Sequence, residues 1–148
     1  MRRFASARFA LLALFALLGP TPAAASDADT LERFGMLGTF AVDCAAPASR
    51  SNPHLVYAAT RQGNVTRTLK MEPGLDGTFP MRNLRLLGPD RLQYEETGRR
   101  AEFIVTVARI GDKFRSWQSV QADGKVLIQD GKFPDSGAPT LAFERCRT

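Results

Sequence analysis

The sequence predicts an all-β protein, in which an antiparallel up-and-down meander of about eight or nine short strands closes into a small barrel. Turn signals that predict the meander recur at short, fairly regular intervals from about Thr39 onward. They are Gly63-Asn64, Asp76-Gly77, Gly88-Pro89-Asp90, Thr97-Gly98, Gly111-Asp112, Asp123-Gly124 and Asp130-Gly131. These residue types accept the backbone angles of hairpin turns.

The segments between these turns have the composition of strands. HLVYAAT, AEFIVTVARI and KFRSWQSV are rich in β-branched and aromatic residues and contain no glycine or proline, which is typical of strands joined by tight turns. No helical pattern separates them, so each strand is expected to pair antiparallel with its neighbour. An open sheet of that many strands leaves long unpaired edges, which favours closure into a barrel.

Residues 1–25 are expected to be a signal peptide that is cleaved before Ser26. MRRFASAR is basic, FALLALFALL is a short apolar run, and Ala23 and Ala25 provide the small residues of a cleavage site. A spanning helix needs about 20 apolar residues, so a retained anchor is the less favoured alternative. No cysteine follows the cleavage site closely enough for a lipid anchor. We expect a protein without a stable membrane anchor, in the periplasm or secreted.

Cleavage also removes the three arginines of the leader, which leaves 17 of the 20 basic residues against 15 acidic ones, a net charge of +2. This charge is too small to argue for nucleic acid as a partner. The remaining 123 of the 148 residues suit one domain. A single β-barrel domain is therefore expected over residues 38–148.

A short helix or plug is expected over residues 26–37, in the segment SDADTLERFGML. Its candidate N-cap residues are Asp27, Asp29 and Thr30. Leu31, Phe34 and Leu37 form one apolar edge, and the glycines at positions 35 and 38 end the pattern. A helix that runs directly into the first strand can cover one end of a barrel. The alternative is a frayed tail, because chain termini are commonly disordered unless they dock.

The first and last strands each precede one of the chain's two cysteines, Cys44 in GTFAVDC and Cys146 in LAFERC. In a closed barrel these strands are neighbours, so the two cysteines of an exported chain are expected to form a disulfide across the seam. Two free thiols are the alternative. No metal is expected, because two cysteines and a single histidine, His54, do not supply four ligands at metal-site spacing.

Nothing in the sequence favours an enzyme. No nucleophile elbow, zinc-protease motif or phosphate-binding loop is present, so no catalytic residue and no cofactor are expected. His54 begins a strand after a proline-containing loop and lacks any motif around it. Glu95 and Glu96 are adjacent in a strand and therefore point to opposite faces, so they cannot share one proton. Asn64-Val65-Thr66 fits a glycosylation sequon but begins at a turn, where asparagine is favoured for backbone reasons.

The strand AEFIVTVARI is apolar on both faces. Phe103, Val105 and Val107 lie on one side, and Ile104, Ala108 and Ile110 lie on the other. A barrel wall that is solvated on one face should instead alternate between apolar and polar residues. The second apolar face must therefore be covered by the N-terminal helix, by another protein or by a ligand.

This layout resembles the lipocalin-like (calycin) barrels, which begin with a helical turn, a Gly-x-Trp strand and a long first loop over the open mouth. Here GTF, from Gly38 to Phe40, stands where Gly-x-Trp would be, residues 45–53 form the long loop, and Arg145 lies in the last strand. Phenylalanine thus replaces tryptophan. The resemblance implies that Gly38, Phe40 and Arg145 pack together at one end of the barrel.

Two functions remain open. The favoured one is a non-catalytic barrel that binds a small apolar or amphipathic ligand, with Tyr57, Tyr94, Phe103 and Trp117 expected to line its cavity. The alternative is a protein-interaction module, such as a periplasmic inhibitor of proteases or lysozyme, that inserts its N-terminal segment or the loop AAPASRSNP into a target. A cavity of several hundred Å³ favours the first function, whereas a packed interior favours the second.

Overall fold

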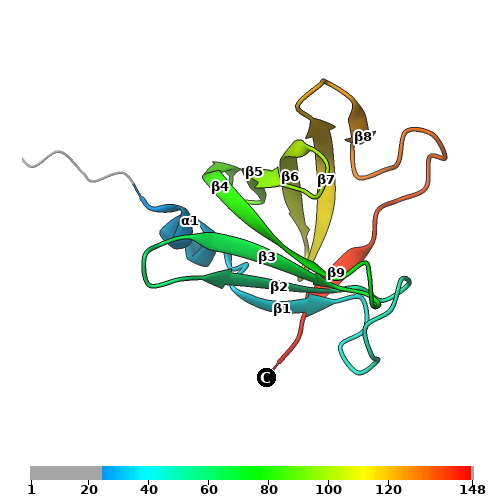
Figure 1. Ribbon diagram of the computed structural model, residues 1–148, viewed down its shortest axis with the longest axis horizontal. Coiled ribbons are helices and arrows are strands. Elements are labelled where there is room, and N and C mark those ends of the chain that lie inside the picture. Colours follow the sequence, from blue (N-terminus) through cyan, green and yellow to red (C-terminus); the bar gives the residue numbers. More distant parts are fainter. Residues whose placement is uncertain (1–24, 148) are drawn as a thin grey trace, which may run out of the picture.

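The computed structural model describes residues 25–147, and these residues form a closed antiparallel barrel (Figure 1). The elements are α1 (Asp27–Phe34), β1 (Gly38–Ala41), β2 (His54–Ala59), β3 (Val65–Lys70), β4 (Gly77–Gly88), β5 (Arg91–Thr97), β6 (Glu102–Ile110), β7 (Lys113–Gln121), β8 (Val126–Ile128) and β9 (Ala142–Arg145). The predicted all-β meander with a short N-terminal helix is confirmed. The expected signal peptide, apart from Ala25, lies outside the described residues.

Eight strands close the barrel. Strands β1 to β7 pair with their neighbours in sequence, and β9 pairs with both β7 and β1. Strand β8 is an additional strand outside this set of eight, and it pairs only with Ser119 and Val120 near the end of β7. The predicted closure is therefore confirmed, because the last strand of the meander returns to the first.

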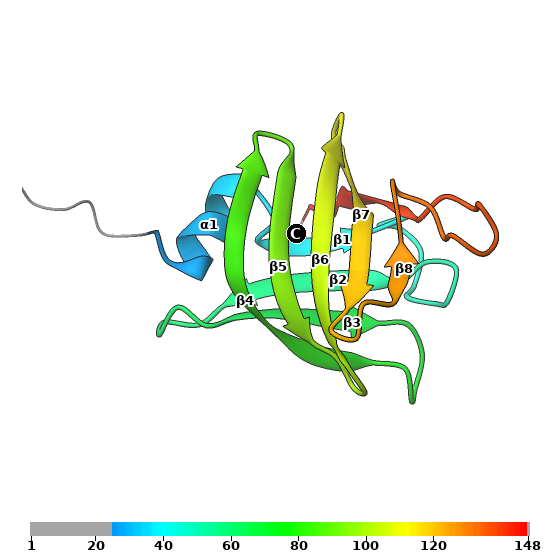
Figure 2. The same ribbon diagram turned by 90° about the horizontal axis from the view of Figure 1, so that it is seen from above.

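The long strand β4 bends as it passes from the layer of β1–β3 into the layer of β5–β7 (Figure 2). The bend coincides with a register shift between Arg82 and Arg85 in the pairing with β5, and Asn83 has a φ of 55°. Backbone N–H groups released by such a bulge need other partners. The Asp27 carboxylate supplies them, because it accepts from the N–H groups of Asn83 and Leu84 at 3.0 and 2.8 Å.

Helix α1 begins one residue earlier than the candidate caps suggested. Its N-cap is Ser26, whose hydroxyl accepts from the Asp29 N–H while the Asp29 carboxylate accepts from the Ser26 N–H, a capping box. The expectation of Asp27, Asp29 or Thr30 as N-cap is wrong, because Asp27 instead binds β4. Gly35 ends the helix in the left-handed conformation, at a φ of 79°, as the sequence predicts.

The side chains of α1 complete the core at one end of the barrel. Leu31, Phe34 and Met36 are 0–1% exposed. The Phe34 ring lies 5.5 Å from the Phe114 ring, which in turn lies 5.3 Å from Phe40. The N-terminal segment is thus a plug and not a frayed tail. Leu37 lies beyond the helix and is only partly buried against this core.

The seam between β1 and β9 carries the disulfide. Cys44 and Cys146 are bonded, with their Cα atoms 5.3 Å apart, and the Cys146 N–H donates to the Thr39 carbonyl at 2.9 Å. Cys146 follows β9 directly, whereas Cys44 lies in the loop just beyond β1. The predicted disulfide between the first and last strands is therefore confirmed.

The three residues expected to pack at the barrel end are neighbours. Phe40 is the register partner of Arg145, whose guanidinium donates to the Leu37 carbonyl at 2.7 Å. Gly38 has a φ of 122°, an angle that favours glycine, and a Cβ there would stand 3.4 Å from the Arg145 guanidinium. At the helix end of the barrel, Arg109 lies over aromatic rings, at 5.0 Å from the centre of Phe34 and 5.4 Å from that of Phe114.

The outer face of β6 is covered only in part. Ala108 is 1% exposed, and its register partners on the two flanking strands are Arg91 and Arg115. Ile104 and Ile110 are about half exposed, at 47% and 52%. The expectation that α1 might cover this face does not hold, since α1 packs at the end of the barrel.

Candidate functional site

A cavity of about 430 Å³ occupies part of the barrel interior. It lies away from α1, because Phe103 at the start of β6 lines it, whereas Arg109 at the end of the same strand contacts the helix. Apolar side chains from five strands form much of its wall. They are Leu55, Leu69, Phe79, Phe103, Val105 and Ile128. The barrel is therefore packed at the helix end and hollow at the other.

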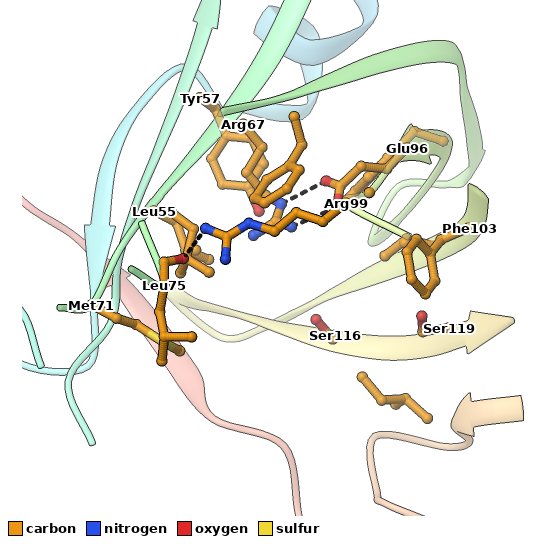
Figure 3. Close-up of a pocket in the computed structure, with 16 residues that line it drawn as sticks. Leu55, Tyr57, Arg67, Met71, Leu75, Glu96, Arg99, Phe103, Ser116 and Ser119 are labelled. Atoms are coloured by element: carbon orange, nitrogen blue, oxygen red, sulfur yellow. Dashed lines mark hydrogen bonds and ion pairs between the residues drawn. The ribbon is translucent and has the colours of Figure 1, made fainter. Parts of the chain in front are cut away.

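Two turns meet at the mouth of this cavity. Met71 and Leu75 come from the β3–β4 turn, and Arg99 comes from the β5–β6 turn (Figure 3). The Arg99 guanidinium donates to the carbonyls of Gly74 and Leu75 at 2.9 and 2.6 Å, and also to that of Asp76. Arg99 thus ties the two turns together at the rim.

A charge pair lies inside the cavity. Arg67 of β3 donates from Nε and Nη2 to the two carboxylate oxygens of Glu96 of β5, at 2.6 and 2.5 Å (Figure 3). The side chains are 18% and 6% exposed. Burial by itself lowers the pKa of Arg67, but the hydrogen bonds to Glu96 and the charge interactions with Tyr94, Tyr57 and Glu96 together outweigh burial and raise it. The guanidinium is therefore a permanent cation matched by a carboxylate.

The chain's two tyrosines stand beside this pair and line the cavity. Burial raises the pKa of Tyr57 to about 12. Burial, followed by the neighbouring Tyr57, raises the pKa of Tyr94 well above its ordinary value. Both phenols therefore stay protonated at physiological pH, where each hydroxyl can donate and accept a hydrogen bond.

Three of the four expected lining residues are brought together, namely Tyr57, Tyr94 and Phe103. The prediction for Trp117 is wrong, because it does not line the cavity: its ring lies on the outer face beneath the Arg91 guanidinium, at 3.9 Å. A bulge is the reason. Ser116 pairs with Val107 and Gln118 with Thr106, so Trp117 is the extra residue between them.

The charged residues of the site were not identified from the sequence. Arg67 and Glu96 are separated by 29 positions, and no local pattern links them. The signal that was available is Glu96 itself, because adjacent acids on a strand place one carboxylate on the inner face. Glu95 does lie outside, 3.1 Å from Arg82, whereas Glu96 is 5% exposed inside the barrel.

The residues considered for catalysis do not assemble. His54 lies outside the set of lining residues, with its Nε2 within 3.1 Å of the Ala46 carbonyl, and the Glu96 carboxylate is held by Arg67. Within residues 25–147, no three histidine, cysteine or acidic residues are placed to hold a metal ion. The site offers apolar surface, hydroxyls and a matched ion pair, which are groups for binding.

The loop of residues 42–53 is held in shape by Asn52, which is 8% exposed. Its side chain accepts from the Asp43 N–H at 2.8 Å and donates to the carbonyls of Asp43, Ala46 and Pro47 at 3.0–3.2 Å. The disulfide at Cys44 fixes the same loop to β9. The segment expected to insert into a target is therefore well ordered.

No protein-family model, curated protein or solved structure matches this chain. Among the helices of residues 25–147, none combines the length and the apolar character needed to cross a membrane. The cavity and its lining are therefore the observations from which a function is argued.

Proposed function

We propose that the protein is a non-catalytic barrel that binds a small apolar or amphipathic molecule inside the cavity. One observation carries this proposal: the barrel interior holds a mostly apolar cavity with a volume of about 430 Å³. Small-molecule sites typically have volumes of about 300–1,000 Å³, mostly apolar walls and a few convergent polar groups. The Arg67–Glu96 pair and the two tyrosines are such groups.

We also propose that the barrel is lipocalin-like and works in the periplasm or outside the cell. Its eight-strand antiparallel architecture is consistent with a calycin-like fold. The position of the Arg145 guanidinium, 3.4 Å from where a Cβ on Gly38 would stand, supports the finer likeness. A disulfide persists in an oxidising compartment, which agrees with the expected signal peptide.

A neutral fluorescent probe, N-phenyl-1-naphthylamine, tests ligand binding. It should bind the folded protein saturably, and Ser119→Phe should weaken binding by about tenfold or more because Ser119 lines the cavity. The control is Gln118→Phe, which adds the same ring on the outer face of the same strand and should leave binding unchanged. No saturable binding by the unmodified protein would contradict the proposal.

The second candidate, a protein-interaction module, is favoured by the ordered loop of residues 42–53. Arg50 projects from this loop, with a side chain 72% exposed that pairs with Glu72. A protease inhibitor presents a rigid exposed loop, since pre-organisation lowers the entropic cost of binding. Inhibition assays with trypsin-like proteases and with lysozyme test it. Inhibition that Arg50→Ala abolishes, and Arg61→Ala at the β2–β3 turn does not, would support this function.

A further inference from the structure

We infer that the cavity selects amphiphiles with an uncharged, hydrogen-bonding head group over anionic amphiphiles of the same shape, and that Glu96 sets this selectivity. The inference rests on the proposed ligand binding and names the chemical class of the ligand. The head groups it favours are those of amides and alcohols.

The argument begins with the cation inside the cavity. An arginine in an apolar cavity attracts carboxylates when it is free, but Arg67 already holds both oxygens of Glu96. A ligand carboxylate would therefore have to displace Glu96 or lie beside it. Displacement leaves a carboxylate unpaired whose side chain is only 6% exposed, and that is strongly unfavourable. A ligand carboxylate that lies beside Glu96 brings two negative charges together where screening by solvent is weak.

The other cation of the lining, Arg99, does not change this balance. Its Nη1 donates to the Gly74 carbonyl and its Nη2 donates to the carbonyls of Leu75 and Asp76, so three of its five N–H groups are already used. The residue is also exposed at the mouth, where water and salt screen its charge. Arg99 therefore adds little preference for an anion within the cavity.

The polar groups that remain suit a neutral head. The hydroxyls of Tyr57, Tyr94, Ser116 and Ser119 lie in the lining, and each can both donate and accept a hydrogen bond. The pair with Glu96 also leaves Nη1 of Arg67 unused by the carboxylate. An amide offers an acceptor and two donors to this set, whereas a carboxylate offers only acceptors. A cationic head gains little either, because Arg67 already balances the Glu96 charge and a second cation would lie beside the first.

The apolar wall then accepts the chain of the amphiphile. Leu55, Phe79, Phe103 and Val105 contribute to it, and they bury methylene groups equally well whichever head is attached. A comparison at constant chain length therefore isolates the contribution of the head group.

The test uses decanamide and decanoate, which share a chain and nearly the same head shape and differ in charge at pH 8. The affinity of each is measured by its displacement of N-phenyl-1-naphthylamine from the mature, disulfide-bonded protein. Decanamide should bind more tightly than decanoate by about tenfold or more. In Glu96→Gln, Arg67 keeps its charge without a matching carboxylate, so decanoate should gain affinity by about tenfold or more and approach or overtake decanamide.

Glu95→Gln is the matched control, because it makes the same change at the next residue on the outer face, where the partner is Arg82. The ratio of the two affinities should stay that of the unmodified protein. The double variant Arg67→Gln with Glu96→Gln removes both charges. It should keep the preference for decanamide, because the gain of decanoate in Glu96→Gln requires the unmatched Arg67 cation. If Glu96→Gln does not fold, a double variant that prefers decanoate still overturns the inference.

The outcomes separate the inference from the proposed function. Saturable probe binding with decanoate at least as tight as decanamide overturns the inference and leaves ligand binding intact. Probe binding that neither amphiphile displaces also overturns it. If the probe does not bind at all, the proposed function and the inference both fail. A preference for decanamide that disappears in Glu96→Gln and persists in Glu95→Gln supports both.

Discussion

At the scale of single residues, the Arg67–Glu96 pair contributes to stability as well as to the site. Glu96→Ala leaves the Arg67 cation largely buried without a partner, which should lower the free energy of unfolding by about 3 kcal/mol. Urea denaturation measures this loss. Glu95→Ala is the control and should have little effect, because its partner Arg82 is half exposed, at 49%. Equal losses for the two variants would contradict the internal pair.

The two tyrosines predict how the protein responds to alkali. The pKa of Tyr57 is raised from 10.0 to about 12 in the folded state, and that of Tyr94 is also raised. Between pH 10 and pH 12 the unfolded chain therefore binds fewer protons than the folded one, so stability is complete below pH 10 and falls as the pH rises through this range.

Absorbance of tyrosinate near 295 nm checks this, because the protein has no other tyrosine. Little absorbance should develop at pH 10, and it should appear together with the loss of secondary structure at higher pH. A half-titrated signal at pH 10 in the folded protein would show that at least one phenol is accessible to solvent.

At the scale of elements, α1 is held by its cap and by its contact with the bend of β4. Asp27→Ala removes two hydrogen bonds that the carboxylate accepts from β4 N–H groups and should cost about 2 kcal/mol. Ser26→Ala removes the N-cap and should cost about 1 kcal/mol. Thermal unfolding measures both. Glu32→Ala, at an exposed helical position, is the control, and an Asp27→Ala effect no larger than the control would mean that the helix docks through its apolar side chains alone.

The helix also explains why the barrel differs at its two ends. The side chains of Leu31 and Phe34 fill the interior at one end, whereas the opposite end is bounded by turns tied by Arg99. A single short element thus fills one end of the barrel, and the cavity lies toward the other end.

At the scale of the whole molecule, the disulfide joins the first and last strands of the barrel across 102 positions of sequence. Cys44→Ser should lower the free energy of unfolding by about 4–5 kcal/mol in the chain-entropy model, seen as a sharp fall in melting temperature. Non-reducing mass mapping should show Cys44 linked to Cys146 in exported protein. Two free thiols in that material, or a melting temperature that reduction leaves unchanged, would contradict this role.

The sequence by itself determined the elements of this protein. Glycine-containing turns and β-branched runs predicted the strands, two cysteines allowed one pairing, and Gly35 marked the end of α1. These features are local, because they follow from backbone angles and from residues that adjoin each other in the chain. These local features are all consistent with a sheet that closes on itself, and this consistency made the barrel predictable.

Only the tertiary structure decided the candidate site. The bulge at Trp117 turned one expected lining residue outward, since a shift of one residue in a strand exchanges its faces. The pairing of Arg67 with Glu96 depends on the register of β3, β4 and β5 together. The cavity itself is the space that the side chains of several strands leave unfilled. Its volume depends on how all of these strands pack together, so it cannot be read from any single segment of sequence.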